Sequence, residues 1–412
     1  MKLGLSAYAN CWGQRGAGQY YRLRVPMIAL GKLGLADTFI DDPFQDEGKR
    51  SEYAWNASIQ AHYMVAGKTM HEQTKRIAEM VPARNAMGDT QYPPAIVYDV
   101  DDDIETISPL NPKFSALGTR DMDGNLFDPV TDIGIMFDND SLGTGDPVYL
   151  WKHGVDTPHG AFDAGRNIVA HAQVRKMAAT AHAITCTSPE LQDVMKRWNP
   201  RTYVYPNSLL FDEFQSFDIR RPADEVRVMW QGGYSHFPDF YPLKNAFHDA
   251  HVRMPSVKWV VFGTMFPWVY EKISPFRVEF HKWVSHELFH MKLGTLAVDI
   301  NIAPLADTKF NRCKSGIKWY EAAALKIPTL ASRVTPYKEE IIDGETGMLF
   351  TDGREFVEKL EMLVKDPDLR ARIGKNASDW VHEHRDAMKN VVPLAEFYRT
   401  LVKEVRGHDI AA

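Results

Sequence analysis

Cysteine and long apolar runs are the features that this sequence has least of. Only three of its 412 residues are cysteines, Cys11, Cys186 and Cys313. Their spacing fits no metal site and their odd number forms no complete disulfide framework, so we expect a reducing, cytoplasmic location. No apolar run approaches the roughly 18 residues that span a bilayer. The N-terminus turns polar too early for a signal peptide, and we expect no integral membrane contact.

An excess of charge of one sign is also missing. The formal net charge is −6 at pH 7, so the chain has no global attraction for nucleic acid or acidic membranes. Local basic patches occur only at Arg220–Arg227 and Lys309–Lys318. A hydrophobic content of 44% is typical of a globular protein with a full core. The length of 412 residues allows two or three domains of ~100–200 residues each.

Strand-like and helix-like segments alternate through most of the chain, and the series is interrupted once. The interruption is a polar, irregular stretch at Phe211–Asp224, which we interpret as a linker. The strands expected after it are Val226–Trp230, Val257–Phe262, Val278–His281, Leu296–Ile302, Thr329–Ser332 and Met348–Phe350. Two such series predict an α/β protein with parallel sheets, in two Rossmann-like domains that face each other across a cleft.

Four aspartates follow one strand of the first series directly. The expected strand is Ala95–Val100, and the run contains Asp99, Asp101, Asp102 and Asp103. Because open α/β sheets bind ligands beyond the carboxyl ends of their strands, these side chains should face the cleft. An Asp-x-Asp pair at such a place can hold a divalent metal that carries a nucleotide's phosphates, so a metal site is one interpretation of the run.

The stretch from Phe310 to Gly347 carries the strongest pattern. We expect a helix from about Lys314 to Leu325, and successive residues of a helix turn by ~100°. Lys314, Lys318 and Glu321 then share one face near the helix N-terminus. That end carries partial positive charge and suits a diphosphate, and Glu321 is placed to accept hydrogen bonds from ribose hydroxyls. The alternative is a solvated face with paired charges.

The same stretch resembles the nucleotide-sugar site of GT-B retaining glycosyltransferases, the group 1 kind of bacteria and phages. The family pattern K-x-x-E-A-x-A-x-x-x-P-x-x-A-S appears at Lys318–Ser332, and Glu340–Gly347, with the sequence E-I-I-D-G-E-T-G, is similar to the family's E-x-I-x-D-G-x-x-G. The resemblance implies that Glu321 binds the donor's ribose. It also implies that backbone N–H groups of Ser315, Gly316 and Ile317 hold the diphosphate.

Further segments are similar to the same family. Trp230–Asp239 contains the G-x-x-S-H-x-x-D version of the loop that opens the second domain, which brings Gly233, Ser235 and His236 into the donor site. Arg22 follows the N-terminal glycine loop as in members with Y-R-x-x-x-P, and we assign it to the acceptor site. The resemblance implies an acceptor-binding domain over residues 1–212, completed by about 386–412. The nucleotide-sugar domain covers residues 213–385.

The sequence departs from the family pattern in two places. Relatives carry a first glutamate eight residues before the ribose-binding one, and Cys313 stands there. Many also place an arginine and a lysine in the loop that here offers Ser235 and His236. We therefore expect the cationic clamp on the diphosphate to consist of Lys314, Lys318 and His236. The loop with Gly16 and Gly18 lacks a full dinucleotide fingerprint; it is either a backbone approach to the donor phosphates or a simple tight turn.

The expected activity is transfer of a sugar from UDP or another nucleoside diphosphate to an acceptor hydroxyl, with retention of configuration. Since the donor signals lie in the second domain with cations of their own, no metal is required. Asp101 and Asp102 are then expected to orient or deprotonate the acceptor, the alternative being a capped loop with Asp103 exposed.

The acceptor stays open at the level of the sequence. Phage-like motifs suggest a hydroxymethylated pyrimidine in DNA or a virion protein, in which case the location is the host cytoplasm. A bacterial surface polysaccharide or glycolipid is an alternative. A non-catalytic sugar-nucleotide-binding protein is another, motivated by Cys313. The oligomeric state is unknown.

Overall fold

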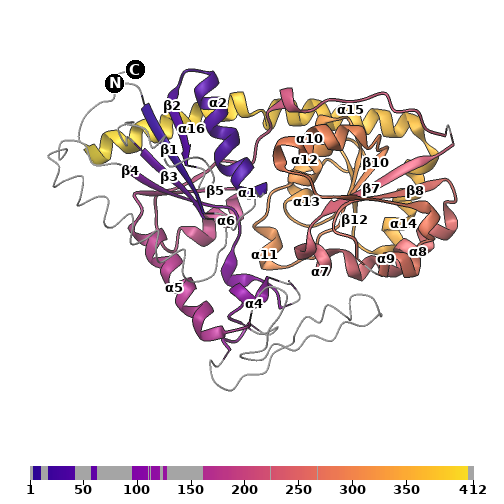
Figure 1. Ribbon diagram of the computed structural model, residues 1–412, viewed down its shortest axis with the longest axis horizontal. Coiled ribbons are helices and arrows are strands. Elements are labelled where there is room, and N and C mark those ends of the chain that lie inside the picture. The colour runs from indigo at the N-terminus through magenta and orange to yellow at the C-terminus, as the bar shows by residue number, and fades with distance from the viewer. Residues whose placement is uncertain are drawn as a thin grey trace.

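The structure is a computed structural model that folds into two lobes (Figure 1). It describes residues 3–10, 17–41, 57–62, 95–109, 111, 113–120, 124–127, 161–222, 224–266 and 268–406. Each lobe is built around a six-stranded sheet in which every strand pair is parallel. The α/β class expected from the alternation is therefore confirmed.

The first sheet has the order β2-β1-β3-β4-β5-β6. Its strands are β1 (Leu3–Asn10), β2 (Ala36–Asp41), β3 (Ala57–His62), β4 (Ala95–Val100), β5 (Ala183–Cys186) and β6 (Thr202–Val204). The helical segments of this lobe are α1 (Ala17–Gln19), the π-helical turn η1 (Tyr20–Arg24), α2 (Val25–Lys32), η3 (Ile104–Thr106), α4 (Phe114–Leu117), α5 (Ala164–Thr180) and α6 (Pro189–Met195). Helix α6 begins directly after Ser188, whose side chain caps it by accepting from the Leu191 N–H at 3.2 Å.

The second sheet has the order β12-β11-β10-β7-β8-β9. Its strands are β7 (Val226–Gly232), β8 (Val257–Gly263), β9 (Val278–Lys282), β10 (Ile300–Ala303), β11 (Thr329–Ser332) and β12 (Met348–Phe350). The order reverses between β7 and β10, and ligands of doubly wound sheets bind at that switch point. One expected strand was too long: Leu296 caps a helix and Ala297 has a positive φ of 49°, so the strand begins only at Ile300.

Helices surround the second sheet in the figure (Figure 1). They are η6 (Tyr234–His236), α7 (Phe237–Phe240), η7 (Tyr241–Leu243), α8 (Lys244–Arg253), α9 (Trp268–Lys272), η8 (Pro275–Arg277), α10 (His286–Thr295), α11 (Lys309–Arg312), α12 (Ile317–Ala324), α13 (Tyr337–Glu340), α14 (Gly353–Lys365) and α15 (Pro367–His384). None of the helices in the described part of the chain is long and apolar enough to cross a bilayer.

The chain crosses between the lobes twice, and the two crossings touch. Leu209 donates to the Arg385 carbonyl at 2.7 Å, and Ala387 donates to the Leu209 carbonyl at 2.9 Å. The final helix α16 (Ala387–Arg406) then runs along the first lobe and packs against α2 (Figure 1). A single buried cluster joins α16 to residues of both sheets, including Leu5 of β1 and Leu349 of β12.

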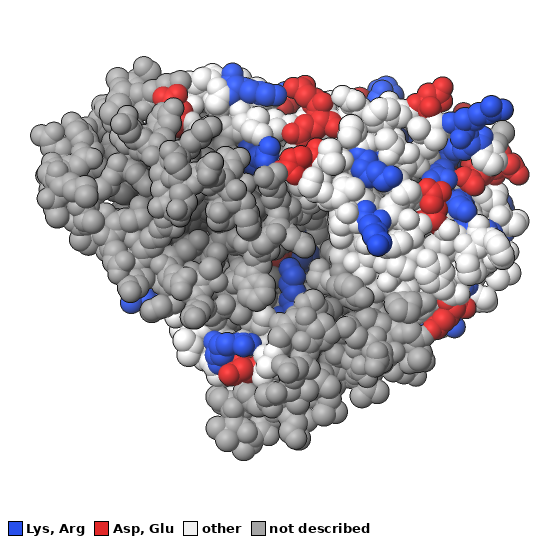
Figure 2. All heavy atoms as spheres, viewed as in Figure 1, with Lys and Arg blue, Asp and Glu red and all other residues white. Residues whose placement is uncertain are grey.

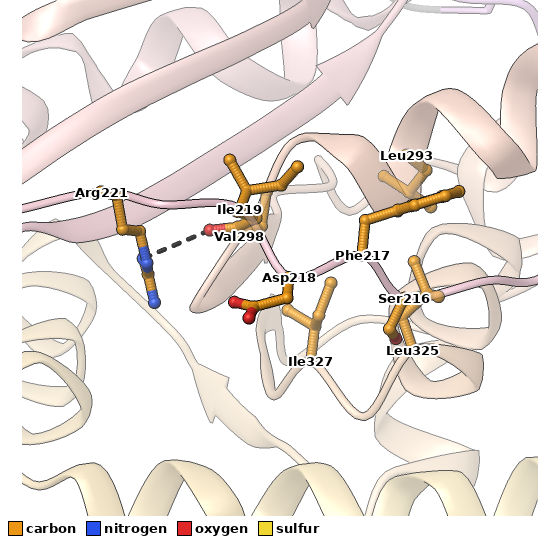
Figure 3. Close-up of a pocket in the computed structure, with 11 residues that line it drawn as sticks. Ser216, Phe217, Asp218, Ile219, Arg221, Leu293, Val298, Leu325 and Ile327 are labelled. Atoms are coloured by element: carbon orange, nitrogen blue, oxygen red, sulfur yellow. Dashed lines mark hydrogen bonds between the residues drawn. The ribbon is translucent and has the colours of Figure 1, made fainter.

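The linker between the lobes begins with the short turn η5 (Phe211–Glu213) and then runs over the end of α10. It borders a hollow of about 240 Å³, whose lining includes Phe217, Asp218 and Arg221 of the linker together with Leu293, Leu325 and Ile327 (Figure 3). Arg221 fixes the linker's far end by donating to the Ala297 carbonyl at 3.2 Å and pairing with Asp299. The hollow lies apart from the residues expected to be functional.

Candidate active site between the lobes

Expected site residues from three separate segments meet between the lobes. Lys314 Nζ lies 3.1 Å from Asp102 Oδ1, which follows β4. Lys318 Nζ lies 3.0 Å from His236 Nε2, in the loop after β7. The aspartates of the first domain and the cations of the second therefore share one site, although about 210 residues of chain separate them.

The helix that carries the cations begins later than the sequence predicted. Helix α12 starts at Ile317, after the separate short helix α11, and Gly316 is its N-cap. Lys314 therefore precedes the helix and does not share a helical face with Lys318, as we had expected. Ser315, Gly316 and Ile317 do lie at the helix N-terminus, where backbone N–H groups have no partner within the helix. Glu321 lies one turn further on.

His236 is held between an acid and a cation. Its Nδ1 lies 2.7 Å from Asp239 Oδ2, and the other oxygen of Asp239 accepts from Asn311 Nδ2 at 2.7 Å and from the Ala306 N–H at 2.9 Å. Burial, and then the nearby Lys318 charge, lower the pKa of His236 to about 4. The imidazole is therefore neutral at pH 7, donating through Nδ1 and accepting from Lys318 through Nε2. It adds no positive charge to the clamp, contrary to our expectation.

Lys318 remains a cation despite its surroundings. Burial lowers its pKa to about 8, against the attraction of the Glu321 carboxylate. At pH 7 most of the molecules therefore carry an ammonium group at this position. One of its three N–H groups donates a hydrogen bond to His236, so the ammonium keeps two further N–H donors for a ligand.

The aspartate run contains side chains in three different situations. Burial, followed by the charges of Asp102 and Asp99, raises the pKa of Asp101 to about 8. Asp102 is paired with Lys314; burial alone would lower the pKa of Lys314, but Asp102, Asp239 and Asp101 together raise it. Asp103 is 3% exposed and caps η3 by accepting from the Glu105 N–H at 3.2 Å. The capped loop, which was the alternative interpretation, is therefore present, but its Asp103 is buried and not exposed as that interpretation predicted.

Glu321 is almost completely buried, with 5% of its surface exposed. Gln231 Nε2, at the end of β7, donates to its Oε2 at 2.8 Å, and the Tyr21 hydroxyl of the first lobe donates to its Oε1. Burial raises the pKa of this carboxyl group. The sequence reasoning missed Tyr21 and Gln231, and no local spacing connects them with Glu321.

Arg22 lies in the interior of the first lobe, with 1% of its side chain exposed. Its guanidinium forms a bidentate pair with Asp99, at 2.9 and 2.7 Å, and donates to Asn207 Oδ1 at 3.2 Å. Asn207 in turn donates to Ser315 Oγ at 2.8 Å. Arg22 therefore reaches the site through Asn207, and an acceptor-binding role for it stays a prediction.

The glycines assigned to the donor site fall in three places. Gly16 lies outside the described residues, and Gly18 is a buried residue of α1. Gly233 begins the turn η6, where its carbonyl accepts from the His236 N–H at 3.1 Å, and Ser235 is half-buried in the same turn. Gly233 and Ser235 thus position His236, whatever contact they make with a ligand.

Cys313 packs into the first lobe. It belongs to a buried cluster with Val100 and Cys186, and its carbonyl accepts from Ser188 Oγ at 2.9 Å. Burial raises the pKa of the thiol to about 12, so it is neither a thiolate nor a substitute for a carboxylate at pH 7. Lys113 is a further cation near Asp102, and burial lowers its pKa. No sequence motif marks it as a site residue.

A cavity of about 440 Å³ lies between the lobes and reaches the Lys314–Ser315 turn. Its polar lining combines Ser188 and Glu190 of the first lobe with Glu340 and Arg385 of the second. Among the described residues, no group of three or more His, Cys, Asp or Glu side chains is arranged to hold a metal ion.

Comparisons with known proteins point in one direction. Residues 244–394 match the family model described as "Glycosyl transferase-like". A segment of 89 residues is 33% identical to the capsular polysaccharide biosynthesis glycosyltransferase CapM of Staphylococcus aureus, covering 21% of this chain and 23% of that protein. A longer segment is 23% identical to the glycosyltransferase 1 domain-containing protein 1 of Xenopus tropicalis, covering 45% of this chain and 56% of that protein.

Solved structures match over nearly the whole chain. Sucrose-phosphate synthase from Thermosynechococcus elongatus aligns with a TM-score of 0.61 and 16% identity, covering 97% of this chain and 100% of that one. HepE of Anabaena in complex with UDP-glucose aligns with a TM-score of 0.54 and 12% identity, over 95% and 98% of the two chains. The chain therefore has the GT-B fold. The family match and the two sequence relatives cover parts of the chain and are likewise described as glycosyltransferases.

Proposed function

We propose that the protein transfers a glycosyl group from a nucleoside diphosphate sugar to an acceptor hydroxyl, with retention of configuration. The observation that carries this proposal is the chain Asp239–His236–Lys318 at the N-terminus of α12, with Glu321 one turn further on. This arrangement combines a fixed cation and unpaired helix N–H groups with a carboxylate at the spacing of a diphosphate and its ribose.

The leaving diphosphate is the group that this site stabilises. Negative charge builds up on it as the bond to the sugar breaks, and oriented donors in a water-poor cleft stabilise that charge strongly. Lys318 supplies two N–H donors, and His236, fixed by Asp239, holds the ammonium in place. The N–H groups of Ser315, Gly316 and Ile317 supply the rest. Because these groups carry the charge, we propose that transfer needs no metal.

The acceptor hydroxyl is placed on the side of the first lobe. Asp102, held by Lys314, is available to orient the hydroxyl, and Asp101 lies beside it. With a pKa of about 8, Asp101 is mostly protonated at pH 7, so it can orient the hydroxyl by hydrogen bonding there and becomes a base as the pH rises. We therefore keep Asp101 and Asp102 as the residues that orient or deprotonate the acceptor.

We propose a UDP-sugar as donor and a glycan as acceptor. HepE was solved with UDP-glucose, and CapM is named for capsular polysaccharide synthesis. A DNA acceptor is disfavoured because the net charge is −6. On the face that Figure 2 shows, charges of both signs are interspersed over the described surface of the second lobe. The free, buried thiols of Cys186 and Cys313 fit a cytoplasmic protein.

A mass-spectrometric screen tests the proposal. The full chain is incubated with UDP-, GDP-, ADP- and CDP-sugars and with oligosaccharide, glycolipid, protein and hydroxymethylated DNA acceptors, each with and without EDTA. We expect a mass increase of one glycosyl unit on a glycan acceptor, unaffected by EDTA. Labelling of DNA or protein alone would refute the glycan assignment. Donor binding without transfer or hydrolysis would favour a non-catalytic binding protein.

A further inference from the structure

The carboxylate of Glu321 receives hydrogen bonds from both lobes. Gln231 of β7 donates to Oε2 at 2.8 Å, and Tyr21 of the π-helical turn η1 donates to Oε1. Tyr21 is 1% exposed, so the hydroxyl makes this contact in the interior, between the lobes. Glu321, the proposed ribose-binding residue, is thus part of the second lobe but is held by side chains of both lobes.

The π-helical turn explains how the first lobe reaches so far. Such turns are rare and occur frequently at functional sites. Here the turn brings two neighbouring tyrosines together, with ring centroids 5.0 Å apart in an edge-on arrangement. Their hydroxyls serve different carboxylates, since Tyr20 donates to Glu213 and Tyr21 to Glu321. The two tyrosines are nevertheless linked, because Glu213 also contacts His290, which lies against Tyr21.

His290 fixes the direction of the Tyr21 hydroxyl. Its Nε2 lies 2.8 Å from the Tyr21 oxygen, and its Nδ1 lies 3.0 Å from Glu213 Oε2. When Glu321 is ionised, it can only accept, so the single hydroxyl proton of Tyr21 points toward it. The tyrosine oxygen then accepts from His290. The hydroxyl of Tyr21 has little freedom to rotate, because it lies in a series of contacts that runs from Glu213 through His290 and Tyr21 to Glu321.

The remaining capacity of Glu321 matches a ribose. An ionised carboxylate has about four acceptor positions, and Tyr21 and Gln231 occupy two of them. Two remain, which is the number that the 2′ and 3′ hydroxyls of one ribose require. Both oxygens must keep their present orientation for this, because a rotated or protonated carboxyl group would offer the diol fewer acceptors.

We propose that Tyr21 is a positioning residue, which holds Glu321 in the orientation that accepts both hydroxyls of the donor's ribose. The preference of the second lobe for a ribonucleotide over a deoxynucleotide then depends on the Tyr21 hydroxyl, which belongs to the first lobe. This inference rests on the proposed function, because it takes Glu321 as the ribose contact. It adds the residue that makes the contact selective and assigns His290 the task of fixing that residue.

Binding of paired nucleotides to the full chain tests the role of Tyr21. Calorimetry first identifies the tightest-binding member of UDP, GDP, ADP and CDP, and then compares it with its 2′-deoxy counterpart. We expect the wild type to prefer the ribonucleotide about tenfold, the value of one good hydrogen bond. Tyr21→Phe should reduce this preference to about twofold, with the deoxynucleotide affinity changed less than about threefold. Tyr203→Phe, the control, removes a hydroxyl from β6, where the ring stacks on Phe397 with centroids 4.6 Å apart, and it should keep the wild-type preference.

The ratio of the ribonucleotide affinity to the deoxynucleotide affinity separates a positioning role from general damage, since a misfolded site would weaken the binding of both nucleotides equally. His290→Leu is the second variant: it leaves Tyr21 and Glu321 in place but removes the N–H group that fixes the hydroxyl, and it should lower the preference about threefold. An unchanged ratio in Tyr21→Phe, or tighter ribonucleotide binding, would overturn the inference, the latter by showing that the hydroxyl competes with ribose. If the wild type binds none of the four diphosphates, the proposed function itself fails.

Discussion

At the scale of single residues, the two lysines of the site differ more than their spacing suggests. Lys314 lies before α12 and is neutralised by Asp102 of the other lobe, whereas Lys318 lies on the helix and contacts the neutral His236. A cation with a neutral partner retains its full charge for a ligand. We therefore assign the stabilisation of the diphosphate mainly to Lys318, and the joining of donor and acceptor sides to Lys314.

Replacement of Lys318 by alanine tests this division. Because the ammonium is expected to contact the leaving phosphate, Lys318→Ala should reduce kcat by ~10²-fold or more. Initial rates with a saturating donor measure the effect. Lys375→Ala is the control, since that side chain is 68% exposed on α15 and should leave the rate unchanged. Normal turnover by Lys318→Ala would contradict the assignment.

Asp102 provides a second test, on the acceptor side. The substitution Asp102→Asn keeps the size of the side chain but removes its charge and its ability to take a proton. Transfer should fall by ~10²-fold or more, the usual contribution of a general base. Calorimetric binding of the nucleoside diphosphate should change by less than threefold. Asp193→Asn, at a position 75% exposed on α6, is the control. Loss of binding together with transfer would argue against separate donor and acceptor roles.

At the scale of the elements, the sequence predicted most of the strands but not all of them. The second sheet was readable because its strands are short apolar runs, which are typical of a parallel sheet covered on both faces. Strand β3, with the sequence ASIQAH, was missed because it is short and only Ile59 is a strong strand former, although it pairs with β1 on one side and β4 on the other. Such a strand is specified by its neighbours.

The candidate site shows the same limit. Lys318 and Glu321 were recognisable because their spacing on one helix carries the chemistry. Tyr21 could not be found in this way, because 300 residues separate it from Glu321 and only the fold brings the two together. The start of α12 was placed too early for a similar reason, since Lys314 continues the pattern of charges but precedes the N-cap Gly316.

One glycine determines how the linker lies on the second lobe. Gly294 is in α10, directly under the linker, and a Cβ atom there would come within 1.8 Å of the Gln215 carbonyl oxygen. Gly294→Ala should therefore displace the linker and lower the free energy of unfolding by about 1–3 kcal/mol, although alanine is the better helix former. Thermal unfolding followed by circular dichroism measures the change.

Gly31→Ala is the matched control for this substitution. Gly31 is an exposed residue of α2, and the nearest atom to an added Cβ is a rotatable side-chain oxygen, Thr38 Oγ1, at 3.2 Å. Here the gain in helix propensity should dominate, so that stability stays equal or rises by up to about 1 kcal/mol. Equal stability of the Gly294→Ala protein and the wild type would show that the linker is free to move away from α10.

At the scale of the whole molecule, the two lobes share one core. One buried cluster contains Leu5 of the first sheet, Leu349 of the second, and Leu394 of the final helix α16. Helix α16 follows the second lobe in sequence but packs against α2 of the first. Unfolding either lobe would therefore expose apolar surface of the other, which favours a single cooperative transition over two independent ones.

Replacement of Leu394, which is 1% exposed, tests this coupling by scanning calorimetry. Truncation of a buried leucine to alanine costs about 2–5 kcal/mol, so Leu394→Ala should shift the whole transition to a lower temperature. Val392→Ala on the same helix, at a side chain that is 46% exposed, should change stability by less than about 0.5 kcal/mol. Should Leu394→Ala instead split the transition, with one part unmoved, the lobes would unfold independently. The shared cluster would then hold the lobes together without coupling their stability.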